Sequence, residues 1–286
     1  YICVLKACGI VGALEIGKDI DAEVRKQGLL HKDICLGTAL VDMYSKCGAL
    51  EEAREVFDKI PTQDVVSWGA LIAGYAQHGF NEEALKCFKQ MQDEGISPDS
   101  VTYICILKAC GNVASLEMGE NIDAEIRKQG LLKKDLVLGN GLIDMYSKCG
   151  ALDTAKQVFD KIPTRNVVSW TALIGGYVQQ GKEDIALQLF MELIKERVQL
   201  DEVTYIYALR ACSNLSALEQ GRKIHVHLIE SGLSLGSCVG NALVDMYVKC
   251  ENLYDATAVF NRLPIRDVIA WTALLAGYAQ QGFGEK

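Results

Sequence analysis

The eleven cysteines are the residues of this 286-residue chain with the greatest capacity for metal or disulfide chemistry. Their spacing argues against both. Cys8, Cys110 and Cys212 are 102 residues apart, and Cys47 and Cys149 repeat that interval, so equivalent cysteines should lie far from one another in the fold. No C-x-x-C pair, the spacing typical of zinc sites, occurs in the sequence. We therefore expect reduced cysteines that serve as small packing residues in a reducing compartment.

The histidines and tryptophans have equally simple interpretations. His225 and His227 are the only close histidine pair, and residues at i and i+2 of a helix point away from each other, so we expect no metal and no cofactor. Trp68, Trp170 and Trp271 each lie three residues before a leucine. That spacing is typical of a buried helical stripe, so we expect packing rather than base stacking from the tryptophans.

The composition indicates a folded chain. Half of the residues are apolar and 23% are charged, which argues against general disorder. No apolar run approaches the ~18 residues of a membrane-spanning helix, and residues 1–30 lack the layout of a signal peptide. The formal net charge is −8, which argues against a protein that holds phosphates through bulk positive charge.

Internal repeats define the architecture that must position these residues. The segment Tyr1–Cys8 returns as Tyr103–Cys110 and Tyr205–Cys212. Each 102-residue block divides further at recurring strings, such as VVSW at Val65–Trp68 and Val167–Trp170. Complete repeats rotate through lengths of 35 or 36, 31 and 35 residues. The nine repeats are 1–33, 34–64, 65–99, 100–135, 136–166, 167–201, 202–236, 237–267 and 268–286.

Each repeat is predicted to form two helices. In repeat 65–99, Trp68, Leu71 and Tyr75 form one helical stripe before Gly79, and a second stripe follows. A lone hairpin of ~35 residues cannot bury its apolar face, whereas stacked hairpins can. The sequence therefore predicts a single all-α solenoid. Because the first and last repeats are incomplete, we expect the sequence to be part of a longer protein.

Two families of helical repeats fit these lengths. Repeat 65–99 partly matches the tetratricopeptide pattern, with Ile72 in place of a small residue, but the 31-residue repeats do not fit its period of about 34 residues. The chain more closely resembles the pentatricopeptide repeat family, specifically the PLS subclass, whose P, L and S motifs rotate with similar lengths. The strings VVSWTALIGGYVQQG, LKACGNVASLEMG and NGLIDMYSKCGALDTAKQVFDKIP are typical of its P, L and S motifs, respectively.

The resemblance implies a right-handed superhelical α-solenoid that binds single-stranded RNA, one base per repeat. The L motifs are then 1–33, 100–135 and 202–236, the S motifs 34–64, 136–166 and 237–267, and the P motifs 65–99, 167–201 and 268–286.

In this family the fifth and last residues of a motif contact the base edge, and the second residues of adjacent motifs enclose the base. The implied base-contacting residues are Thr38 with Asp64, Gly69 with Asp99, Asn140 with Asn166, Thr171 with Asp201, Asn241 with Asp267, and Thr272. The implied enclosing residues are Cys35, Val66, Val101, Val137, Val168, Val203, Cys238 and Ile269.

The chemistry of these pairs suggests an RNA target. A carboxylate only accepts hydrogen bonds, so a last-position Asp favours the ring N–H of guanine or uracil, whereas Asn tolerates adenine or cytosine. Combined with the family's preference at position five, this implies G for the two Thr/Asp pairs, U for Asn241 with Asp267, and a pyrimidine for Asn140 with Asn166. Gly69 offers no side chain to a base. The implied target is 5′-N-G-K-N-Y-G-N-U-R-3′, where K is G or U.

The L motifs are expected to contribute differently. They carry Ile2, Ile104 and Ile206 at position five, and an aliphatic group cannot hydrogen-bond a base. In the PLS subclass, L motifs are associated with MORF-type editing cofactors, and Ile104 and Ile206 would lie near the groove for such a partner. The subclass often ends in a zinc deaminase with H-x-E and C-x-x-C signatures. Neither signature is present, so this chain is not expected to be an enzyme.

The resemblance thus implies RNA recognition within organellar C-to-U editing, in a chloroplast or a mitochondrion. A tetratricopeptide-like protein-interaction scaffold is the alternative, mildly favoured by the acidic charge. The Asp and Asn residues also have a second interpretation, because residues just past helix ends serve as turn residues or as N-caps. A local basic stripe, with stacking contacts of roughly 1–3 kcal/mol per base, would suffice for binding by an acidic protein.

Overall fold

The computed structural model describes residues 1–30, 32–133, 135–196 and 198–282. In these residues, loops join seventeen α-helices and one 3₁₀ helix, η1, and no strand occurs, so the expected all-α fold is confirmed. None of the described helices is long and apolar enough to cross a membrane. The elements are α1 (Ile2–Val11), α2 (Leu14–Lys26), α3 (Ile34–Lys46), α4 (Leu50–Lys59), α5 (Val65–Gln77), α6 (Asn81–Asp93), α7 (Ser100–Asn112), α8 (Leu116–Lys128), η1 (Leu131–Lys133), α9 (Leu136–Lys148), α10 (Leu152–Lys161), α11 (Val167–Gln179), α12 (Glu183–Lys195), α13 (Glu202–Leu215), α14 (Leu218–Glu230), α15 (Ser237–Lys249), α16 (Leu253–Arg262) and α17 (Val268–Gln280).

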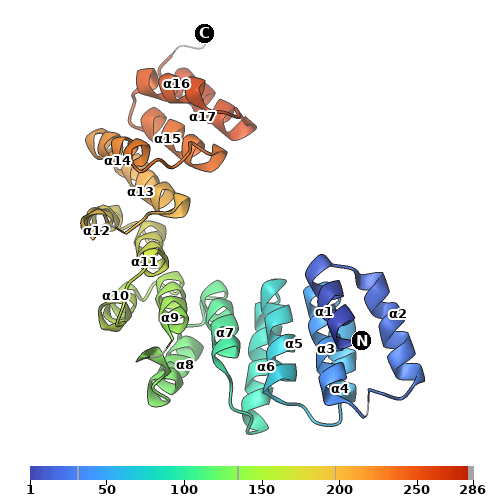
Figure 1. Ribbon diagram of the computed structural model, residues 1–286. Helices are drawn as coiled ribbons and strands as arrows, with labels where there is room; N and C mark the ends of the chain where they lie inside the picture. The colour runs from blue at the N-terminus through green and yellow to red at the C-terminus, as the bar shows by residue number, and fades with distance from the viewer. Residues whose placement is uncertain (31, 134, 197, 283–286) are drawn as a thin grey trace. The chain divides into compact units, whose positions relative to one another are not determined.

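The odd-numbered helices are termed A helices here, and the even-numbered helices B helices. Every predicted repeat begins with an A helix, and a B helix follows in all repeats except the last, of which residues 283–286 lie outside the described residues. The chain forms two compact units, Tyr1–Cys149 and Gly150–Lys286. Within each unit, successive A helices pack side by side, as α3 does with α1 and α5 (Figure 1). Each unit is therefore a stack of helical hairpins.

The B helices form the second layer of each unit. Helix α4, for example, contacts α3 of its own repeat and α5 of the next, and α12 contacts α11 and α13 in the same way. The strongest amphipathic pattern lies on the B helices, where charged residues alternate with a buried stripe such as Leu50, Ala53 and Phe57. One apolar face per B helix is thus covered by two A helices, which is how a hairpin too small to fold alone becomes stable.

Two of the three tryptophans lie in this core, as predicted. Trp68 and Trp170 are almost fully buried, and each ring packs edge-on against a phenylalanine of the preceding B helix, Phe57 and Phe159. Trp271 makes the equivalent contact, with ring centroids 4.6 Å apart, but is 48% exposed. Helices α6 and α12 pack on the helices that carry Trp68 and Trp170, and the described residues include no corresponding helix after α17. The prediction of a buried side chain is therefore not tested at Trp271.

Cysteines of two different repeat series lie close together in neighbouring repeats. The Cys47 thiol lies 3.7 Å from the carbonyl oxygen of Cys8, and Cys149 lies 3.9 Å from that of Cys110. All eleven thiols are free, and burial raises the pKa of Cys110 to about 12. Such a thiol stays protonated at neutral pH, which favours a packing role.

The two histidines point to different neighbours. His225 Nδ1 lies 2.9 Å from the Tyr247 hydroxyl of α15, whereas His227 Nδ1 lies 2.8 Å from the Tyr205 hydroxyl of α13. Burial lowers the pKa of His225. The expected separation of the rings is confirmed, and each imidazole links its B helix to an adjacent A helix.

Candidate nucleic-acid interface

The second residue of each A helix from α3 to α17 is exposed. The third residue of the helix faces the core instead, and Ser67 and Thr102 at this position are fully buried. The six valines and isoleucines at the second position are 47–65% exposed, and both cysteines at this position are exposed. These residues are Cys35, Val66, Val101, Val137, Val168, Val203, Cys238 and Ile269. Isolated exposed apolar residues are normal on a surface, but an exposed one at the same place in every repeat indicates a shared role.

The last residues of the repeats cap the next A helix. The Oδ1 atoms of Asp64, Asp99 and Asp201 each accept the backbone N–H of the third residue of the following A helix at 2.8 Å. Asn166 and Asp267 cap α11 and α17 in the same way, at 3.0 and 2.9 Å. The capping interpretation of these residues is therefore confirmed at all five positions.

Capping leaves the second carboxylate oxygen available. Within the described residues, Oδ2 of Asp64, Asp99 and Asp201 has no hydrogen-bond partner, although Oδ1 is engaged. The cap bond also fixes the direction of the carboxylate, because Oδ1 is held at the helix N-terminus. A fixed carboxylate with one free acceptor oxygen can serve as a cap and contact a ligand N–H at once.

The fifth residues lie one helical turn inside the A helix and are less accessible. Thr38, Gly69 and Thr171 are half-buried, Asn140 and Asn241 are buried, and Thr272 is exposed. The Thr38 hydroxyl oxygen is buried and has no hydrogen-bond partner in the described part of the chain. An unsatisfied buried hydroxyl costs roughly 1–3 kcal/mol, which a ligand hydrogen bond would recover.

Asn241 and Asp267 form a direct pair. The Asn241 amide nitrogen donates to both carboxylate oxygens of Asp267, at 3.0 and 2.8 Å. The backbone N–H of Ala270 and this amide lower the pKa of Asp267, so the carboxylate is ionised at neutral pH. The fifth residue of one repeat and the cap of the next A helix therefore form one polar site.

Thr204 connects Thr171 to Asp201, a link that sequence reasoning missed. The Thr204 hydroxyl donates to Asp201 Oδ1 at 2.5 Å and lies 2.5 Å from the Thr171 hydroxyl. Thr102 holds Asp99 in the same way, at 2.8 Å, but the residue facing it is Gly69. A Cβ atom on Gly69 would lie 3.2 Å from the Thr102 hydroxyl oxygen. The signal that identifies these threonines is their place three residues after a capping Asp.

Repeats 100–135 and 202–236 lack this polar constellation. Ile104 and Ile206 occupy the fifth position, half-buried and without a polar atom. Asp135 caps α9 through its Oδ1, 2.9 Å from the N–H of Val137, whereas α15 begins after Gly236, which provides no side-chain cap. A side-chain hydrogen bond to a ligand could therefore come only from Asp135 in repeat 100–135, and from neither position in repeat 202–236.

The negative charge is concentrated on the B helices. Within the helix bounds given above, B helices carry 23 Asp and Glu residues and 15 Lys and Arg residues, whereas A helices carry four and six. The A helices themselves therefore carry a small surplus of bases. Their N-termini, however, carry six further negative charges on the capping residues Asp33, Asp64, Asp99, Asp135, Asp201 and Asp267. A polyanion would therefore be attracted to the cations along the A helices and not to the capped helix ends.

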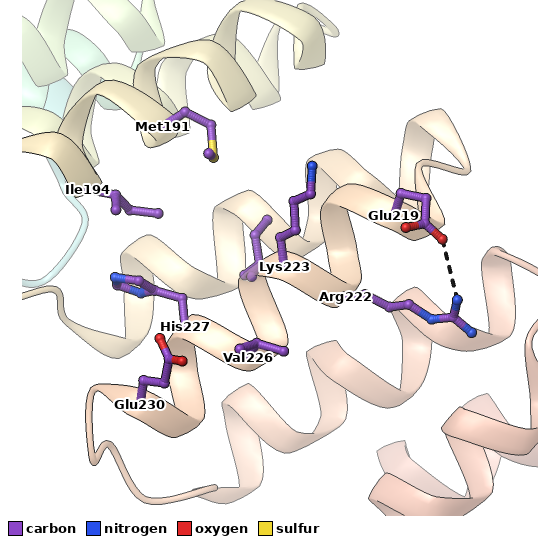
Figure 2. A pocket seen from close by; sticks show the side chains of 9 residues that line it. Met191, Ile194, Glu219, Arg222, Lys223, Val226, His227 and Glu230 are labelled. Carbon is purple, nitrogen blue, oxygen red and sulfur yellow. Dashed lines mark hydrogen bonds and ion pairs between the residues drawn. The ribbon is translucent and has the colours of Figure 1, made fainter.

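A shallow groove between α12 and α14 is a feature of the B layer. Met191 and Ile194 of α12 face α14 across it (Figure 2). At its edge, Arg222 bonds Glu219 at 3.3 Å and Asp255 at 3.0 Å. None of the predicted base-contacting residues lines this groove.

The cap role can be measured separately from ligand binding. Replacing Asp201 with alanine is expected to lower the free energy of unfolding by about 1 kcal/mol, because α13 loses its N-cap. Asp201→Asn is expected to preserve stability, since Asn166 caps α11 with the same geometry. Urea titrations followed by circular dichroism test both variants. If both variants lost the same free energy of unfolding, the side-chain oxygen of residue 201 would not be what stabilises the helix end.

Comparison with known proteins identifies the repeats. A family model described as "PPR repeat family" matches residues 63–112 and 165–214, and one described as "PPR repeat" matches 38–65 and 140–167. Together they cover more than half of the chain. A mitochondrial pentatricopeptide repeat-containing protein of Arabidopsis thaliana is 38% identical over 286 residues, all of this chain and 45% of the relative. A chloroplastic one is 38% identical over 280 residues, 98% of this chain and 45% of the relative.

The fold has a solved counterpart. The crystal structure of the pentatricopeptide repeat protein PPR10 in complex with an 18-nt psaJ RNA element superposes with a TM-score of 0.77 at 17% identity. The alignment covers 95% of this chain and 41% of that one. This similarity shows that the chain has the fold of a helical repeat solenoid. The chain spans less than half the length of these relatives.

Proposed function

Because the chain belongs to the pentatricopeptide repeat family, we propose that it binds single-stranded RNA sequence-specifically, one base per repeat. The crystal structure of PPR10 holds an 18-nt RNA element on the same fold, and family models match repeats of both units.

One observation supports this proposal most directly. At the N-terminal end of the A helices from α3 to α17, except α15, an exposed apolar residue accompanies a capping Asp or Asn. In S and P repeats the fifth residue lies nearby, and it is polar at every position except Gly69. Stiff β-branched walls suit the flat face of a base, and a fixed acceptor suits its Watson–Crick edge. The face and the Watson–Crick edge of a base would therefore both be contacted by residues at the N-terminal end of an A helix.

The proposed target remains 5′-N-G-K-N-Y-G-N-U-R-3′. The G positions correspond to Thr38 with Asp64 and Thr171 with Asp201, where a free Oδ2 would accept the guanine N1–H. The direct pair of Asn241 with Asp267 would contact U, and Asn140 with Asn166 a pyrimidine. Gly69 with Asp99 would accept G or U.

The role of the whole protein is proposed from the same family. We assign the chain to the PLS subclass, as the target-recognition part of an organellar C-to-U RNA editing factor. Chloroplast and mitochondrion both occur among the names of the relatives, and one of these organelles is the compartment. A MORF-type cofactor would bind through the L motifs, near Ile104 and Ile206. We propose no catalytic residue in this chain.

A binding titration tests the proposed function. Fluorescence anisotropy at fixed low salt would compare an RNA carrying the target with the same RNA in which both G positions are C. We expect the target to bind more tightly, by roughly 1–3 kcal/mol for each G contact. Thr38→Asn and Thr171→Asn are expected to weaken binding of the target.

Two other outcomes have clear meanings. Equal binding of both RNAs would contradict the assigned base preferences. An absence of binding to either RNA, with a MORF-type partner present, would overturn RNA binding in favour of a protein-interaction scaffold.

A further inference from the structure

The charges on the A helices differ among the three repeat types. The A helices of P repeats, α5, α11 and α17, contain no Lys, Arg, Asp or Glu. Those of S repeats contain one Asp and one Lys, and those of L repeats contain one cation at an equivalent position. These L-repeat cations are Lys6, Lys108 and Arg210.

The S-repeat lysines are neutralised within their own helices. Lys46 pairs with Asp42 at 2.6 Å, Lys148 with Asp144 at 2.7 Å, and Lys249 with Asp245 at 2.8 Å. The stems of the first two also pack on glycines of the preceding A helix, since a Cβ on Gly9 or Gly111 would lie 3.1–3.2 Å from a lysine Cδ. Each S repeat therefore presents an ion pair rather than a free cation.

The L-repeat cations are exposed and unpaired in the described part of the chain. Lys6, Lys108 and Arg210 are exposed, and within the described residues no ion pair or hydrogen bond engages their charged groups. Helix α13 also carries Glu202, but in its first turn, two turns before Arg210. These three residues are thus free positive charges on A helices.

Helix geometry places the cation on the same face as the proposed base-enclosing residue. Lys108 lies seven residues after Val101, which is close to two full turns and about 10 Å along the axis. Arg210 and Val203 have the same spacing. A strand whose bases lie against the exposed valines would have its phosphates further along this face, within reach of a long basic side chain.

Resting on the RNA binding proposed above, we propose that Lys6, Lys108 and Arg210 bind RNA phosphates, so that the L repeats anchor the backbone while the S and P repeats recognise bases. The division follows from the side chains. Ile104 and Ile206 offer no hydrogen bond to a base, and the free cation two turns along compensates with a contact that carries no sequence information.

The salt dependence of binding tests this assignment. Each phosphate contact to a single strand contributes a slope of about −0.7 to log K against log salt. Lys108→Met is expected to reduce the slope by about that amount and to weaken binding about fivefold at 0.1 M salt, equally for matched and mismatched RNA. Arg210→Met is expected to do the same.

Lys128→Met is the matched control. Lys128 belongs to the same repeat and is also exposed, but it lies on the B helix α8, so its loss changes the net charge identically. We expect it to leave the slope unchanged. If wild-type protein distinguishes the two RNAs but Lys108→Met and Lys128→Met behave alike, the phosphate assignment is wrong and RNA binding stands. If wild-type protein binds neither RNA, the proposed function itself fails.

Discussion

Replacing Trp170 with alanine is expected to lower the free energy of unfolding by about 3–5 kcal/mol, the usual cost of removing a buried aromatic ring. The ring is 2% exposed and packs edge-on against Phe159 with centroids 4.6 Å apart. Its indole N–H donates to Glu196 at 3.2 Å. The substitution therefore removes a contact between α10 and α11 together with a hydrogen bond to the end of α12.

Trp271→Ala provides the control for this prediction. Trp271 makes the same edge-on contact with Phe260, at 4.6 Å, but 48% of it is exposed. Its replacement is expected to cost clearly less, because much of the apolar area is already in water. Urea unfolding followed by circular dichroism measures both variants. Equal losses would show that the aromatic pair, and not burial between helices, supplies the stability.

Exchanging the fifth residues of the two complete P repeats is expected to exchange their base selectivity. Gly69→Thr should convert the third base of the target from G or U to G, and Thr171→Gly should make the sixth base permissive. A bidentate contact discriminates by roughly 1–3 kcal/mol, so the preference should change about tenfold or more. The rest of the two sites is alike, because the Thr102 hydroxyl donates to Asp99 as the Thr204 hydroxyl donates to Asp201. The fifth residue is therefore the difference that we expect to set the selectivity.

The structure indicates that Gly69 can accept this change. The added Cβ would meet only the Thr102 hydroxyl oxygen, at 3.2 Å, so this side chain must move by a few tenths of an ångström. Thr171 and Thr204 occupy the equivalent positions in the other unit, where their hydroxyls hydrogen-bond at 2.5 Å. Binding would be measured with RNAs that vary the third and sixth bases independently. A change at the third base caused by Thr171→Gly, or at the sixth by Gly69→Thr, would contradict one-base-per-repeat recognition.

Local sequence features were enough to predict the elements. The repeat lengths and the stripe of Trp68, Leu71 and Tyr75 predict helical hairpins, because an apolar face and its period belong to a single helix. The same holds for the capping of α5 by Asp64, since its oxygen and the Ser67 N–H are three residues apart. The second residues were likewise identified by their place in a repeat.

Contacts between repeats required the tertiary structure. The meeting of Cys8 with Cys47 and of Thr171 with Thr204 joins residues 39 and 33 positions apart, and the exposure of Trp271 depends on which helices cover it. By itself the sequence determined the helices and their caps, because these depend on neighbouring residues. Only the stacking of A helices decided which side chains share a site, because that depends on the register between repeats.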